Sequence, residues 1–131
     1  TVATVRLRAR LARLAVQRRD WGRAEGLQRA LLGYAQEIAK GPSAAINVAT
    51  ARESLAQTLY QAGGTANIAE ARDLLEDAMD VRASQAGGGL DGPAAGATRR
   101  MMAEAEMAAG DAAAAAGHLS AARANADAAW A

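Results

Sequence analysis

The chain repeats one helix-turn-helix pattern three times, with an alanine wherever two helices have to meet. The pattern occurs as LARLAVQRRDWGRAE from Leu11, as LAQTLYQAGGTANIAEA from Leu55 and as MAEAEMAAGDAAAAA from Met102. A repeat of this length cannot bury its apolar face alone, so neighbouring repeats must stack to form a shared core. We therefore predict an all-α fold of three antiparallel helical hairpins, about six helices in all, stacked as a short solenoid.

The composition favours helices that approach one another closely. Of the 131 residues, 39 are alanine and only 28 are Leu, Ile, Val, Met, Trp or Tyr. Alanine, leucine, arginine and glutamate are strong helix formers, and the β-branched and aromatic residues typical of strands are scarce. A chain of this length suits one domain over residues 1–131, with repeats at about 1–42, 43–90 and 91–131.

Capping and breaking residues divide the chain into six expected helices. Asp20, Ser43 and Asp111 are the expected N-caps of the second, third and sixth helices. Asn67, followed three residues later by Glu70, resembles a capping box and is the expected start of the fourth helix. The segment 86–92 is rich in glycine and is the expected linker before Pro93. The expected helices are about 2–19, 21–40, 43–62, 67–85, 93–110 and 111–130.

Large and small residues recur at matching positions of the three repeats. The first helices carry the pairs Leu11-Ala12, Leu55-Ala56 and Met102-Ala103, and the second helices carry Ala24, Ala71 and Ala115, followed by Leu31, Ala78 and Ala122. Alanine at such positions lets paired backbones approach to the short end of the usual helix separation. This pattern resembles the tetratricopeptide repeat, in the long-helix variant of kinesin light chains. The repeats are 44 and 47 residues apart, and another kind of helical-hairpin array also satisfies the pattern.

The resemblance covers nearly the whole chain and implies a right-handed superhelical slab whose first helices line a concave face. It implies a non-catalytic scaffold that binds a peptide or protein. Clustered arginines on that face would suit carboxylates, because the guanidinium fork donates two parallel hydrogen bonds. We expect an acidic peptide or partner surface there, and the alternative is a solvated helix face. The expected concave residues are Arg6, Arg10, Arg13, Gln17, Thr50, Glu53, Gln57, Tyr60, Arg100 and Glu104.

Charge is distributed unevenly along the chain. Residues 1–65 carry ten basic and four acidic side chains, a net +6, whereas residues 66–131 carry five basic and ten acidic, a net −5. The acidic stripe of Glu70, Asp73, Asp77 and Asp80 could meet a basic partner or the first helix of another copy; the alternative is a solvated outer face. Nucleic acid is an unfavoured partner, because the pI is about 8.2 and aromatic residues are few.

Residues that could support catalysis or bind a metal are scarce in this sequence. The absence of cysteine excludes disulfides and thiolate metal sites. His118 is the single histidine, and no Glu-x-x-His pair or phosphate-binding GxxxxGK[ST] motif accompanies it. We therefore expect no enzyme activity, no cofactor and no metal.

The last helix is poorer in polar residues than the end of a solenoid should be. Its outer side is expected to be mostly alanine, with His118, Arg123, Asn125 and Asp127 as the polar residues. We expect further protein to cover this helix at Leu119 and Trp130, either a continuation of the chain or a partner. Trp21 is expected to pack between the first two helices. An alternative to the scaffold is a structural subunit or terminal domain packed permanently in a larger complex.

Other inferences concern context. Fourteen arginines against one lysine, with abundant alanine and glycine, indicate a GC-rich and hence bacterial genome. No apolar run approaches the roughly 20 residues that span a membrane, and we favour a cytoplasmic location. Since the chain begins at Thr1 and opens directly on a helical pattern, we treat it as a candidate fragment of a longer protein.

Overall fold

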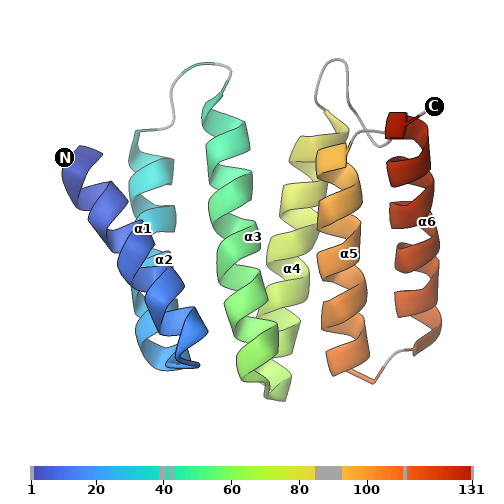
Figure 1. The fold of residues 1–131 in the computed structure, drawn as a ribbon, viewed down its shortest axis with the longest axis horizontal. Coiled ribbons are helices and arrows are strands. Elements are labelled where there is room, and N and C mark those ends of the chain that lie inside the picture. The colour runs from blue at the N-terminus through green and yellow to red at the C-terminus, as the bar shows by residue number, and fades with distance from the viewer. Residues whose placement is uncertain (1, 39–40, 42, 85–92, 111, 131) are drawn as a thin grey trace.

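The computed structural model describes residues 2–38, 41, 43–84, 93–110 and 112–130, and nearly all of them lie in six helices (Figure 1). No strand occurs within these ranges. The all-α prediction is confirmed. The helices are α1 (Val2–Gln17), α2 (Trp21–Glu37), α3 (Ala44–Ala62), α4 (Thr65–Ala83), α5 (Pro93–Ala108) and α6 (Ala112–Trp130).

The helices pack as three hairpins that follow one another along the longest axis of the molecule. Within hairpins α1 packs on α2, α3 on α4 and α5 on α6; between hairpins the main contacts are α2 with α3 and α4 with α5. α3 also packs on α5. The chain termini therefore lie at opposite ends of the stack, and α1 is inclined relative to α3 (Figure 1).

Alanine methyl groups occupy the contact points that the sequence pattern indicates. Ala12, Ala56 and Ala103 are 3%, 0% and 1% exposed. Their partners Ala24 and Ala71 in the second helices are fully buried. Around them, a core of larger side chains is centred on α3 and α4, with Leu55, Leu59 and Leu75 at 0% exposure. The side chain of Ala115 lies outside the described residues.

The turns fix where the helices begin. Asp20 is the N-cap of α2, as predicted, and its side chain accepts a hydrogen bond from the Arg23 amide. Ser43 precedes α3 but makes no side-chain cap bond. The prediction for Asp111 concerns a residue outside the described ranges.

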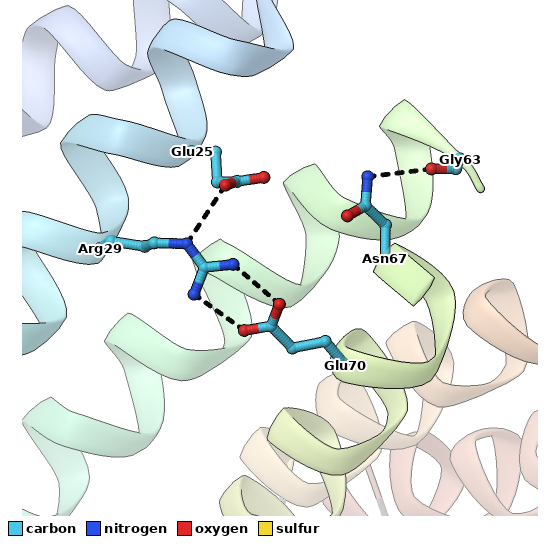
Figure 2. A network of polar contacts seen from close by, with 5 residues as sticks. All are labelled: Glu25, Arg29, Gly63, Asn67 and Glu70. Atoms are coloured by element: carbon cyan, nitrogen blue, oxygen red, sulfur yellow. Dashed lines mark hydrogen bonds and ion pairs between the residues drawn. The ribbon is translucent and has the colours of Figure 1, made fainter. Parts of the chain in front are cut away.

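The predicted cap at Asn67 is wrong, because α4 begins two residues earlier, at Thr65. Gly63 and Gly64 adopt φ values of 85° and 95°, a region that glycine enters without steric cost, so the chain reverses within two residues. Asn67 consequently lies in the first turn of α4, and its side-chain amide donates to the Gly63 carbonyl at 3.0 Å (Figure 2).

Candidate functional site

A groove separates α1 from α3, and α2 forms its floor. It consists of two hollows of about 350 and 280 Å³ that share Gln28, Leu31 and Ser54. The groove lies where α1 is inclined away from the direction of α3 (Figure 1). The corresponding helices of the next pair of hairpins, α3 and α5, pack directly on each other. The volumes fall at the lower end of the range of ligand-binding pockets.

The surface of the groove is mostly apolar, although several polar side chains contribute to it. Ala9, Ala12 and Val16 of α1 line the larger hollow, and Ala51 of α3 lines the smaller one. Among the residues that the structure describes, Arg13 is the only charged residue of the lining. The arrangement can hold an apolar side chain while a single guanidinium group meets a carboxylate. The polar lining residues are Gln17, Gln28, Asn47, Thr50, Ser54, Gln57, Thr58 and Gln61, with Tyr34.

Gln28 is the unusual residue of the floor. It is 8% exposed, and its side-chain oxygen is buried without a hydrogen-bond donor within the described part of the chain. A buried acceptor without a partner costs about 1–3 kcal/mol. The side-chain oxygen of Gln28 in the floor of the groove is therefore a candidate acceptor for a hydrogen bond from a bound peptide.

Part of the predicted concave set lines this groove. Arg13, Gln17 and Gln57 contribute to the larger hollow and Thr50 to the smaller one. Arg6 and Arg10 are exposed on the same stripe of α1 without lining the groove.

Glu53 is not available to a partner, which corrects its assignment to the concave face. The residue is 6% exposed and its carboxylate lies inside the stack, where Arg82 of α4 donates to Oε1 at 2.7 Å. The hydroxyl of Thr98 in α5 donates to Oε2. Glu53 therefore ties three helices together, because each of its oxygens is bonded to a different neighbour.

Tyr60 is likewise a core residue and not part of an open concave surface. It is 7% exposed, and its hydroxyl donates to the carboxylate of Glu104 in α5. Burial, together with this hydrogen bond, raises the pKa of Tyr60 above its usual value. Glu104 and Arg100 are exposed, and neither lines the groove.

One residue of the predicted acidic stripe of α4, Glu70, forms an ion pair within the chain. Arg29 of α2 forms two parallel hydrogen bonds of 2.8 and 2.7 Å with Glu70, and its Nε donates to Glu25 (Figure 2). The hydrogen bonds from Arg29 lower the pKa of Glu70, and those to Glu70 and Glu25 raise the pKa of Arg29. Asp73, Asp77 and Asp80 remain exposed.

His118 and Asn125 of α6 lie closer to the interior of the stack than the sequence pattern predicted. Nε2 of His118 is 3.1 Å from Oε1 of Glu106, a carboxylate that is only 7% exposed. Asn125 is 2% exposed and accepts a hydrogen bond from Arg99, so its prediction as a polar residue of the outer side is wrong. Trp21 is half-buried, and the side chain of Trp130 lies outside the described residues.

Neither a metal cluster nor a membrane span is found in the described ranges. No group of three or more His, Asp or Glu side chains there is placed to hold a metal ion. None of the helices that the structure describes is both long and apolar enough to cross a bilayer.

Sequence reasoning missed the floor of the groove. Gln28 lies 47 residues before Leu75, the same offset that separates Ala24 from Ala71. Leu75 is fully buried, so a polar residue at the matching position of α2 was a signal in the repeat register. The groove itself had no such signal, because its width depends on how α1 is inclined.

Comparison of the chain with protein-family models, with curated proteins and with solved structures found no match in any of the three.

Proposed function

We propose that the chain is a non-catalytic helical-repeat scaffold that binds an acidic segment of a partner protein in the groove between α1 and α3. The observation that carries the proposal is the lining: a mostly apolar surface interrupted by uncharged polar side chains, with Arg13 as the single charge among the described residues. An apolar side chain of the partner fits between α1 and α3, while a neighbouring carboxylate of the partner meets Arg13.

The surroundings of the groove support an acidic occupant. α1 carries four arginines and no acidic residue, so the field at the groove mouth attracts negative charge. The unpartnered oxygen of Gln28 supports a peptide in particular. A backbone or side-chain N–H of the occupant would supply the missing donor and remove the desolvation cost of that oxygen.

A structural subunit packed permanently in a larger complex is the second candidate function. It is favoured by the exposed leucines at the two ends of the stack, among them Leu7 at 56% and Leu119 at 48%. The two candidates differ at the groove, since a scaffold keeps it open to exchange a peptide and a subunit keeps it filled.

The proposal is tested by selecting random short displayed peptides on the purified chain and measuring the affinity of the selected peptides by calorimetry. We expect the selected peptides to combine apolar with acidic residues. Ser54→Trp fills the point where the two hollows meet, at a residue exposed enough to accept the larger ring, and should abolish binding. Ala30→Trp, on an exposed residue of α2 outside the lining, is the matched control and should bind as the unaltered chain does.

Charge reversal tests the role of Arg13 separately. Arg13→Glu should weaken the selected peptides about tenfold or more and reduce the salt dependence of binding, because it places like charges together. Arg123→Glu, an equally exposed reversal on α6, should leave the affinity unchanged. Selection of peptides without acidic residues, or equal affinity for Arg13→Glu and Arg123→Glu, would contradict the proposed function.

A further inference from the structure

Three leucines form an exposed stripe on α1. Leu7, Leu11 and Leu14 are 56%, 43% and 47% exposed, and their spacing of four and three residues places them on one face. None of them lines the groove toward α3. The stripe therefore lies on the face of α1 that points away from the other described hairpins.

The repeat register shows what normally covers this face. Leu11, Leu55 and Met102 are equivalent positions of the three repeats. In this alignment the stripe corresponds to Ala51, Leu55 and Thr58 of α3 and to Thr98, Met102 and Ala105 of α5. In those helices the same positions pack on the hairpin before them: Leu55 is in the core cluster that Leu32 of α2 contacts, and Thr98 bonds to Glu53 of α3. The positions with less than 3% exposure are Leu55, Thr58, Thr98 and Ala105, and the other two, Ala51 and Met102, are half-buried.

The opposite end of the stack presents the complementary half of the same interface. Leu119 of α6 and Met107 of α5 are 48% and 58% exposed. Their counterparts one repeat earlier are Leu75 and Tyr60, at 0% and 7%. Leu75 and Tyr60 are covered by the hairpin that follows, since Tyr60 bonds to Glu104 and both belong to a core cluster that includes Ala105.

From this register we infer that the α1 end of one copy binds the α5–α6 end of a second copy, head to tail, so that the stack continues from copy to copy. The interface repeats the packing that already joins the hairpins within one chain. A hollow of about 80 Å³ beside Leu11 and Leu14 offers room for an apolar side chain of the incoming copy. The inference is independent of the proposed function, because none of these leucines lines the groove.

Charge favours the head-to-tail arrangement over a symmetric one. Residues 1–65 have a net charge of +6, whereas residues 93–131, which supply the other end, carry three basic and four acidic side chains, a net −1, so head-to-tail contact does not oppose two cationic ends. A symmetric contact through α1 would oppose two helices that each carry four arginines and no acid. A head-to-tail contact is heterologous, so it produces open filaments or closed rings and not only dimers.

Sedimentation velocity at chain concentrations from about 1 µM to about 1 mM tests the inference, a range that includes weak association. We expect the weight-average mass to rise with concentration beyond that of a dimer. The double variant Leu11→Glu/Leu14→Glu and the single variant Leu119→Glu should each be monomeric over the same range, since each spoils one end. Ala30→Glu, at an exposed residue of α2 on neither end, is the control and should associate as the unaltered chain does.

Mixing the two end variants distinguishes this arrangement from any symmetric one. Each variant retains the end that the other has lost, so an equimolar mixture should form a one-to-one heterodimer and nothing larger. Three results would overturn the inference. The unaltered chain could stay monomeric at the highest concentration, the Leu119→Glu variant could associate as the unaltered chain does, or the mixture of the two end variants could stay monomeric. The first is the result expected if a helical hairpin from outside this chain covers the ends.

Discussion

Removal of the buried Glu53 carboxylate should destabilise the chain more than removal of one partner of the exposed Arg29–Glu70 pair. The Arg82 and Glu53 side chains are 11% and 8% exposed and meet at 2.7 Å, and the second oxygen of Glu53 accepts from Thr98. Replacing Glu53 with alanine leaves the guanidinium group of Arg82 buried without a carboxylate. Removing one partner of a buried pair costs about 3–5 kcal/mol, a large part of the roughly 5–15 kcal/mol by which a domain is stable.

The prediction is measured by urea and thermal unfolding, followed by far-ultraviolet circular dichroism. Glu53→Ala should lower the free energy of unfolding by about 3–5 kcal/mol and the melting temperature by about 10 °C or more. A double variant, Glu53→Leu with Arg82→Met, removes both charges and should recover most of the loss, because replacing a whole buried pair by apolar groups is often close to neutral. Together with the single variants Glu53→Leu and Arg82→Met, the double variant completes a cycle whose coupling energy should be about 3 kcal/mol.

The control is the exposed pair of Arg29 and Glu70, whose side chains are 44% and 40% exposed. Arg29→Met should cost less than about 1 kcal/mol, because solvent screens an exposed pair. The reasoning is refuted if Glu53→Ala costs no more than Arg29→Met, or if the cycle of Glu53 and Arg82 shows no coupling.

Two further predictions concern helix glycines and pH. Gly26→Ala should stabilise the chain by about 0.5–1 kcal/mol, since glycine disfavours a helix and no atom lies within 4 Å of the added carbon; Gly96→Ala should destabilise it by about 1–3 kcal/mol, because the added carbon would lie 2.9 Å from a side-chain carbon of α6. Urea unfolding checks both, and equal signs would contradict the packing of α5 on α6. The lowered pKa of Glu70 means that its stabilising contribution is complete above the ordinary pKa of 4.5 and is lost as the pH falls below it through the folded-state value. Glu70→Gln should therefore differ from the unaltered chain by less than about 1 kcal/mol at neutral pH, and the difference should vanish at low pH and shrink in high salt; a difference that grows as the pH falls would contradict the assigned pair.

The fold followed from the sequence wherever the determining interaction was local. Asp20 caps α2 because an aspartate before a helix accepts from the first free amides, which needs no knowledge of the rest of the chain. The contact alanines were also predictable, because the repeat gives each of them the same neighbour in every hairpin. The prediction of a cap at Asn67 was wrong for a local reason as well. Gly63 and Gly64, with positive φ, allow α4 to begin before the best capping residue of the segment.

The site followed from the sequence only in part. Arg13 and Gln57, both predicted on the concave face, line the same hollow. Glu53 was placed with them because it lies on a first helix too, but its exposure depends on Arg82 and Thr98 from two other helices, which a helical period does not reveal. Gln28 was missed because the concave face was assigned to first helices, whereas the floor of the groove belongs to a second helix.

The binding of an acidic segment between α1 and α3 is tested most directly by backbone and methyl chemical shifts of the labelled chain, titrated with the tightest of the selected peptides. We expect the largest shifts at Val16, Leu31 and Ser54, which line the groove, and no shifts in α6. Shifts concentrated on α5 and α6, or a titration in which Ser54→Trp responds as the unaltered chain does, would contradict it.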